Sequence, residues 1–166
     1  MTVRISKGAA FYLFPNLVTC FKHASYNQFQ TFYLEDDASL IVLDSFTSGR
    51  KSLGEEWEFW RYYNVNDVWV YGKRVAKDVM LLKQEKEGET RNPRWKGTLP
   101  TRMLADRLAP YSCYATAILY GPVTREKLHN ISQRCEKISV FKQASPPLLL
   151  WSFSWVGPSQ EGGVIS

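Results

Sequence analysis

Cysteine and histidine are scarce in this sequence of 166 residues, which holds three cysteines and two histidines. Cys20, Cys113 and Cys135 form no CxxC pair, which argues against a disulfide framework or a thiolate zinc site and favours a reducing compartment. His23 and His129 belong to no HxH, HxxxH or HExxH pattern, so local spacing predicts no metal site. A site that Cys20, His23 and Cys113 form in space is the alternative left open.

Other common signals are also absent. No run approaches the ~20 apolar residues of a membrane span, and the opening MTVRISKGAAFYLF has no cleavage site of a signal peptide. Gly49 and Gly54 match neither the P-loop nor the dinucleotide fingerprint. Ser48 lies outside a GxSxG elbow, and Cys113 has no local nucleophile signature. We therefore expect a soluble, cytoplasmic protein without membrane partner, tightly bound cofactor or catalytic nucleophile.

Aromatic residues are abundant, with six Trp, nine Tyr and nine Phe making up 14% of the chain. They lie mainly in alternating runs, which favours strands over helices. Apolar residues at 45% and charged residues at 22% are typical of a globular protein, and the length suits one domain. The net charge of +5 is spread along the chain and indicates, weakly, an acidic partner.

Two hairpins are predicted. Residues 26–34 and 39–43 alternate on either side of an acidic turn, which is typical of a hairpin with a short loop. Gly72-Lys73 is a good two-residue hairpin loop between residues 68–71 and 75–82.

The remaining chain is expected to add strands and little helix. Residues 101–108 form one or two helical turns, and Thr124 caps the main helix, which should lie against a sheet. Residues 84–100 form a flexible polar loop because they are charged and interrupted by glycine and proline. Further strands are predicted at 2–5, 111–120, 148–156 and 162–166. Since the first and last of these start or stop abruptly, residues 1–166 are expected to be a single, partial domain, incomplete at both ends.

The most distinctive stretch is residues 45–70, SFTSGRKSLGEEWEFWRYYNVNDVWV. It joins a polar corner, residues 48–61, to an aromatic strand predicted over residues 57–70, with a bulge at 64–67 where the alternation changes phase. On that strand Trp57 and Phe59 should share one face, and Tyr62 should lie on the other.

The pattern FTSGRxxxGExWxFxRY in this stretch resembles the central motif of the UreD (UreH) family of urease accessory proteins, SGRxxxGExxxFxRY. Residues 8–28, GAAFYLFPNLVTCFKHASYNQ, and residues 124–143, TREKLHNISQRCEKISVFKQ, resemble the entry strands and a later helical segment of that family. The residues that match the central motif are Ser48, Gly49, Arg50, Gly54, Glu55, Phe59, Arg61 and Tyr62.

The resemblance implies a mainly β fold, a β-helical stack of sheets with one or two short helices. It also implies a non-enzymatic scaffold for urease maturation. Such a scaffold binds the urease apoprotein and a UreF-type protein, and through it a UreG-type GTPase, and helps to deliver nickel, which passes in transit. On this basis Arg50, Glu55 and Arg61 are expected to pair with one another or to line a polar passage, because a water-lined passage suits a cation that loses its water reluctantly.

Two other functions remain open. Glu55 and Glu56 with Asp44 or Asp67 are candidates for an acid–base pair of a hydrolase, although a salt bridge from Glu55 to Arg50 or Arg61 is the favoured interpretation.

The aromatic and basic residues of the corner also suit a platform for single-stranded nucleic acid. Packing between two layers of sheet is favoured over this platform, because the rings occupy both strand faces. The residues concerned are Trp57, Trp60, Arg61, Tyr62 and Tyr63.

Overall fold

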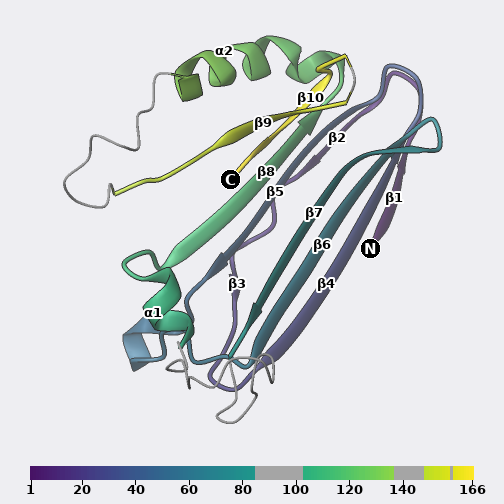
Figure 1. The fold of residues 1–166 in the computed structure, drawn as a ribbon. Coiled ribbons are helices and arrows are strands. Elements are labelled where there is room, and N and C mark those ends of the chain that lie inside the picture. The colour runs from purple at the N-terminus through teal and green to yellow at the C-terminus, as the bar shows by residue number, and fades with distance from the viewer. Residues whose placement is uncertain (85–102, 137–147, 158) are drawn as a thin grey trace, which may run out of the picture.

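Two β-sheets pack face to face in the computed structural model of this chain (Figure 1), which describes residues 1–84, 103–136, 148–157 and 159–166. The four-stranded sheet has the order β1-β4-β6-β7, with β1 Thr2–Ile5, β4 Ser25–Leu34, β6 Arg61–Val70 and β7 Lys73–Lys83. The six-stranded sheet has the order β2-β5-β8-β10-β9, and β3 also pairs with β5. The bounds of its strands are β2 Ala10–Leu13, β3 Val18–Thr19, β5 Ser39–Thr47, β8 Cys113–Tyr120, β9 Phe153–Val156 and β10 Gly162–Ile165. The helical segments are η1 Lys51–Leu53, α1 Leu104–Leu108, η2 Pro122–Thr124 and α2 Arg125–Glu136.

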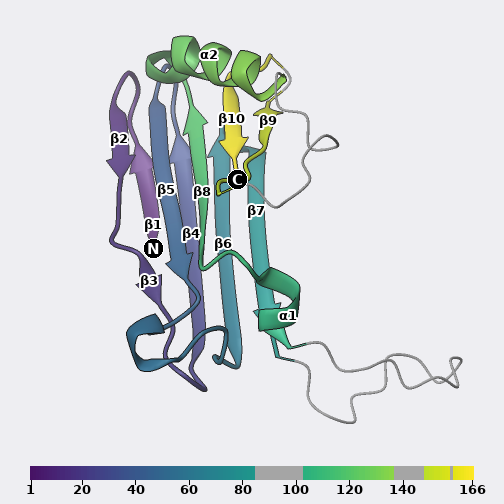
Figure 2. The ribbon, with the colours of Figure 1, turned by 90° about the vertical axis from the view of Figure 1, so that its left-hand side faces the viewer.

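From β1 to β6 the chain coils between the two sheets. It passes from β1 to β2 and β3 in the opposite sheet, returns to β4, crosses to β5 and returns to β6. Successive turns of this coil pair in parallel: β4 lies between β1 and β6, and β5 pairs with β2 and β3. The prediction of a mainly β fold with β-helically stacked sheets and short helices is confirmed (Figure 2).

The predicted hairpin across the acidic turn is wrong. β4 and β5 belong to different sheets, so residues 35–38 form an arch that carries the chain from one layer to the other. Leu34 at the end of β4 and Leu40 near the start of β5 are both buried in one apolar cluster. The arch is favoured over a hairpin because it lets both strands turn their apolar side chains towards the same interior.

The second hairpin is confirmed, with its loop one residue earlier than predicted. Val70 pairs with Lys73, and the loop residues Tyr71 and Gly72 both have positive φ angles, 49° and 71°. Such a pair suits a two-residue loop between twisted strands. The ladder shifts between Val68 and Trp69, so the bulge lies beyond residues 64–67, where it was predicted.

The predicted aromatic strand begins four residues late, at Arg61. Trp57 has a positive φ of 59°, which ends any extended run there. Trp57, Phe59 and Tyr62 consequently meet in one buried cluster, and the prediction that they lie on opposite faces is wrong.

The sandwich holds two apolar clusters. One lies at the end where β4 passes into the arch, and its buried members are Ile5, Phe32, Leu34, Ala38, Leu40, Val42, Val68, Val70, Ala76, Ile118 and Tyr120. The other lies at the opposite end, beneath α1 and the corner, and comprises Cys20, Phe46, Trp57, Phe59, Tyr62, Leu82 and Leu104.

The helices agree with the sequence in position. α1 falls within the predicted turns at 101–108, and α2 contacts β9 and β10 of the six-stranded sheet. Thr124 immediately precedes α2, as predicted, and its hydroxyl donates to the Gly121 carbonyl at 2.9 Å; no hydrogen bond from an α2 amide to this hydroxyl is found among the described residues. No helix among the described residues is long and apolar enough to cross a membrane.

The strands in the second half of the chain are confirmed, although β9 occupies only the end of the predicted run 148–156. β8 is central, lying between β5 and β10. Of the predicted polar loop 84–100, all but Gln84 lies outside the described residues, and Gln84 itself is buried.

Two phenylalanines of β4 test the inward and outward faces. Phe32 is fully buried and Phe29 is 55% exposed on the other side of the same strand. We expect Phe32→Ala to lower the free energy of unfolding by about 3–5 kcal/mol through the cavity it leaves. Phe29→Ala should change it by about 0.5 kcal/mol or less. Urea denaturation of both variants measures the difference, and equal losses would contradict the assignment of faces.

Candidate functional site

The corner, residues 48–61, is held by backbone contacts that need glycine at two positions. Gly49 has a φ of 135°, and a Cβ there would lie 2.2 Å from the Glu55 carbonyl oxygen. Gly54 ends η1 in the left-handed conformation, with φ 74°. The Trp57 amide donates to the Ser48 carbonyl at 2.7 Å and closes the loop. The two glycines of the motif therefore let the chain fold back on itself.

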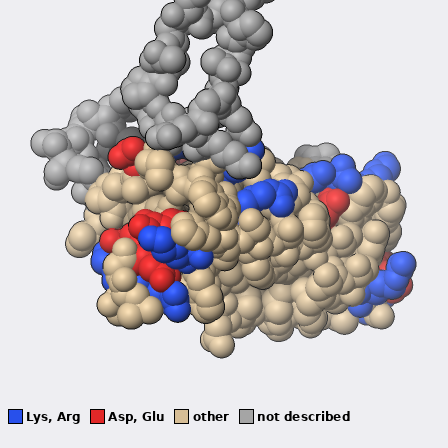
Figure 3. All heavy atoms as spheres, turned by 90° about the horizontal axis from the view of Figure 1, so that it is seen from below, with Lys and Arg blue, Asp and Glu red and all other residues tan. Residues whose placement is uncertain are grey.

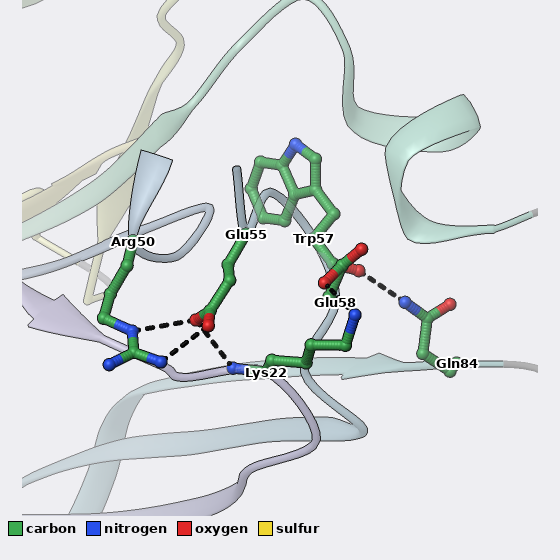
Figure 4. Close-up of polar contacts among 6 residues, drawn as sticks. All are labelled: Lys22, Arg50, Glu55, Trp57, Glu58 and Gln84. Atoms are coloured by element: carbon green, nitrogen blue, oxygen red, sulfur yellow. Dashed lines mark hydrogen bonds and ion pairs between the residues drawn. The ribbon is translucent and has the colours of Figure 1, made fainter. Parts of the chain in front are cut away.

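Arg50 and Glu55 form a two-pronged ion pair across this loop (Figure 4). The Arg50 Nε donates to Glu55 Oε2 at 2.8 Å and Nη2 donates to Oε1 at 2.6 Å. The Lys22 backbone amide also donates to Glu55 Oε2, at 3.2 Å, and the guanidinium lies over the Phe21 ring. The hydrogen bond from Arg50 is the main cause that lowers the pKa of Glu55. The favoured salt bridge from Glu55 to Arg50 is confirmed.

Glu56 ties the corner to the strand entry before β8. Its Oε1 accepts hydrogen bonds from the Ser48 hydroxyl at 3.3 Å and the Ser112 hydroxyl at 3.0 Å, and it pairs with Lys51 at 3.2 Å. Seen from the end of the molecule where η1 and α1 lie, basic and acidic atoms are interleaved in one cluster (Figure 3). The corner therefore does not present a patch of one sign.

Gln84, predicted to lie in a flexible loop, is a structural link. Its side-chain amide donates to the Trp57 carbonyl (Figure 4), and its Oε1 accepts from the Leu104 amide at 3.2 Å. The side chain is buried, and its two hydrogen bonds tie the corner to α1. A glutamine at the end of a strand carries no sequence signal for this role.

The remaining motif residues diverge from the ion pair. Phe59 and Tyr62 are buried in the apolar cluster beneath the corner. Arg61 points the other way: it donates to the Asn27 side chain and lies over the Tyr63 ring. Thus Arg50 and Glu55 meet, whereas Arg61 does not join them.

The carboxylates considered for acid–base catalysis lie apart. Glu55 is paired with Arg50, and Asp67 is paired with Arg74 at 2.8 Å. Asp44 lies inside the sandwich and is bonded to amide side chains. The lowered pKa of Glu55 is also the opposite of what a general acid needs.

The structure shows a polar layer that the sequence did not predict. We call it the polar belt; it lies inside the sandwich between the two apolar clusters and consists of Gln28 and Gln30 of β4, Asp44 of β5, Asn64 and Asn66 of β6, Asp78 of β7 and Thr116 of β8. Five of these residues are buried: Gln30, Asp44, Asn64, Asn66 and Thr116.

Asp44 is the centre of the belt. Its Oδ2 accepts hydrogen bonds from three side-chain amides of the facing sheet: Gln28 at 3.3 Å, Asn66 at 2.9 Å, and Asn64. Gln28 in turn accepts a hydrogen bond from the Tyr26 hydroxyl at 2.6 Å. A buried carboxylate needs such donors, because burial without them is strongly unfavourable.

The belt has more acceptors than donors. Among the described residues, buried oxygens of the belt without a hydrogen-bond partner are Gln30 Oε1, Asp44 Oδ1, Asn64 Oδ1, Asn66 Oδ1 and Asp78 Oδ2. The hydroxyl of Tyr62, a motif residue, also lacks a partner. A small cavity, with about 10 Å³ of room for the centre of a water-sized molecule and partly open to solvent, is lined by Asp44, Phe46, Tyr62, Asn64, Asp78, Met80, Tyr114, Ala115 and Thr116. Water or a cation is the chemical partner that such a set of oxygens can take.

A repeat in the sequence marks the belt. The inward residues of β4 are Tyr26, Gln28, Gln30, Phe32 and Leu34, and those of β6 are Tyr62, Asn64, Asn66, Val68 and Val70. Parallel pairing places these two sets side by side, residue by residue, so each follows the order aromatic, amide, amide, apolar, apolar. The alternation of polar and apolar residues changes phase at 64–67, which predicted a bulge there. The structure gives another reason for the change: Asn64 and Asn66 are polar but occupy inward, buried positions.

The scarce metal-binding residues do not gather. His23 stacks on Trp60 with ring centroids 5.0 Å apart, Cys20 is buried and Cys113 is exposed. Across the described ranges no three His, Cys, Asp or Glu residues form a group that could hold a metal ion. Any ion in the polar belt would meet amide, hydroxyl and carboxylate oxygens instead.

Comparison with known proteins gives a consistent result. Residues 1–164 match the family described as UreD urease accessory protein. The chain is 29% identical over 172 residues to urease accessory protein 4 of Cryptococcus neoformans, covering 99% of this chain and 51% of that protein. It is 31% identical over 147 residues to urease accessory protein D of Oryza sativa subsp. indica, covering 89% of this chain and 43% of that protein. The chain thus spans about half the length of these curated relatives, or less.

The two motif glycines are expected to differ in their tolerance of a side chain. Gly54→Ala should cost about 1–2 kcal/mol, because only its left-handed backbone opposes the change and no atom lies within 4 Å. Gly49→Ala should cost clearly more, because its Cβ would overlap the Glu55 carbonyl. Urea denaturation compares the two variants, and equal costs would show that the corner adjusts freely.

Asp78 gives a prediction on pH. Burial is the main cause that raises its pKa, and the Asp44 charge adds to it. A raised carboxyl pKa means that the folded state binds the proton more tightly, so this group lowers stability as pH rises above the ordinary value of 3.8. Asp78→Asn should therefore stabilise the fold at pH 7, with the gain shrinking towards pH 4. Unfolding free energies across that range check this, and a gain independent of pH would contradict it.

Proposed function

The chain belongs to the UreD family of urease accessory proteins, and from this membership we propose that it is a non-enzymatic scaffold that helps to deliver nickel to urease. The proposal places it in the cytoplasm, bound to the urease apoprotein and to a UreF-type protein, and through that protein to a UreG-type GTPase. Nickel is its cargo and not a resident cofactor.

The polar belt is the observation that supports a route for the cargo. Its unpartnered oxygens come from both sheets, and three of them belong to residues that line a cavity partly open to solvent: Asp44, Asn64 and Asp78. A divalent cation that keeps part of its water can be stabilised by such oxygens one after another. Weak oxygen ligands also suit transit, because imidazole and thiolate groups would hold nickel more tightly.

Asp44 and Asp78 supply the negative charge of this route. Asp44 offers Oδ1, since its other oxygen is occupied by amides, and Asp78 offers Oδ2 from the edge strand β7. Tyr62 connects the family motif to the belt, because it belongs to the motif and lines the same cavity. We therefore assign the corner a structural part: it fixes the start of β6, whose inward residues form the belt.

Single-stranded nucleic acid is the weaker candidate. Trp57 and Tyr62 are buried, and Trp60 stacks on His23, so the rings of the corner do not form one open platform.

Removal of the belt carboxylates should slow nickel delivery. We expect Asp44→Asn and Asp78→Asn to lower nickel-dependent urease activation several-fold while the variant still co-purifies with the urease apoprotein and the UreF-type and UreG-type partners. Asp78→Asn separates function from folding, because it is expected to be more stable than the parent chain. The control is Asp37→Asn, an exposed turn residue with φ 53° where asparagine is tolerated.

The measurements are the urease activity and the nickel content of purified urease after co-expression. Normal activation by both belt variants within intact complexes would contradict the passage and leave the scaffold. Failure of the parent chain itself to enter the complex would contradict the scaffold for this chain.

A further inference from the structure

The four-stranded sheet has a second, outward face that the proposed function does not use. Residues that pair across β4, β6 and β7 form rows on this face. One row is Asn27, Tyr63 and Leu81, and the adjacent row is Phe29, Val65 and Val79. All of these residues except Asn27 are apolar or aromatic. We call Phe29, Tyr63, Val65, Val79 and Leu81 the apolar centre. Phe29, Val79 and Leu81 are 55%, 48% and 52% exposed and form the open part of this centre, whereas Val65 between them is only 8% exposed.

Basic side chains surround the apolar centre. The basic residues at outward positions of β1, β4, β6 and β7 are Arg4, Arg61, Arg74, Lys77 and Lys83. The one acidic residue at an outward position of these strands is Asp67, which is paired with Arg74 at 2.8 Å. A partner for this face therefore needs apolar side chains at its centre and acidic side chains around them.

The arrangement of the rings argues against nucleic acid as that partner. The arginine guanidinium carbons lie over the faces of Tyr33, Tyr63 and Trp69, at 4.9, 4.8 and 4.7 Å from the ring centroids. A base would have to displace an arginine in order to stack on any of these rings. Val65, Val79 and Leu81, which complete the centre, offer no π surface.

The dimensions of the face suit a helix. The three strands β4, β6 and β7 span about 10 Å across, close to the width of one α-helix with its side chains. The rows from Arg61 to Trp69 extend about 27 Å along β6, which is the length of about 18 helical residues. In Figures 1 and 2 the helices of the described chain lie against the six-stranded sheet or at the end of the sandwich, and none crosses this face.

We propose that the outward face of the four-stranded sheet binds an acidic amphipathic helix of a partner protein, about five turns long. Its leucine-like side chains cover the apolar centre, and its carboxylates meet the basic rim. The inference is independent of nickel transit, because the polar belt lies on the other side of the same strands.

The test uses the full 166-residue chain and a fluorescent 18-residue helical peptide with a leucine stripe between glutamates, beside a scrambled peptide of the same composition. The amphipathic peptide should bind, the scrambled one at least tenfold more weakly, and added salt should weaken binding. Val79→Ala combined with Leu81→Ala should reduce affinity about tenfold, since two exposed apolar contacts are lost. Lys77→Glu should reduce it several-fold, whereas Lys127→Glu, the same charge change at an exposed position of α2, should not.

Four results would overturn the proposal. Equal binding of the scrambled peptide would show attraction by charge alone, and unchanged binding by the Val79 and Leu81 variant would place the peptide elsewhere. Tighter binding of a fluorescent thymidine oligonucleotide, with the same sensitivity to these variants, would assign the face to single-stranded nucleic acid. Absence of any peptide binding up to millimolar concentration would also overturn it. Unfolding curves of each variant confirm that the fold is retained.

Discussion

The carboxylate of Asp44 is the interaction on which the centre of the sandwich depends. It is 4% exposed, and no basic side chain within the described part of the chain forms an ion pair with it. Three amide donors of the facing sheet stabilise it instead, which fixes β5 against β4 and β6. Since each amide that donates to Asp44 also carries an oxygen, one buried carboxylate accounts for much of the acceptor excess around it. Removal of one amide donor from such a buried carboxylate typically costs about 1.5–3 kcal/mol.

The coiled topology explains why polar groups gather in a layer. Parallel pairing without a register shift places Gln28 beside Asn64 and Gln30 beside Asn66, so amides on successive turns of the coil become neighbours. The same register places the aromatic rings of Tyr26 and Tyr62 in a stack, with centroids 5.7 Å apart. If β4 and β6 paired in an antiparallel hairpin, the order of inward residues along one strand would run opposite to the order along the other. Amides of one strand would then lie beside apolar residues of the other. The belt therefore follows from the coil as much as from the residues themselves.

The sequence predicts those features that depend on neighbours along the chain. The β class, the loop after Val70 and the Arg50–Glu55 pair all follow from local pattern or from the family motif. It does not distinguish the arch at residues 35–38 from a hairpin, because the same acidic turn serves both and the choice depends on which sheet receives β5. The belt was missed for a related reason: polar residues at inward positions were interpreted as a change of strand phase, since a lone strand does not reveal its partner.

The corner and the belt differ in whether their polar groups are satisfied, and this difference decides which of them suits a moving ion. At the corner Arg50 and Glu55 satisfy one another, and Gln84 both donates and accepts a hydrogen bond, so these side chains hold the segment in place. In the belt Asp44, Asn64 and Asp78 line a cavity and each has a buried oxygen without a partner, so binding of the proposed cation there requires no protein contact to be broken. Side chains whose hydrogen bonds are all made are suited to positioning a strand, whereas oxygen atoms without partners are suited to binding and releasing an ion. The match of the corner to the family motif is thus compatible with the proposed passage one strand away, where Tyr62 lines the cavity.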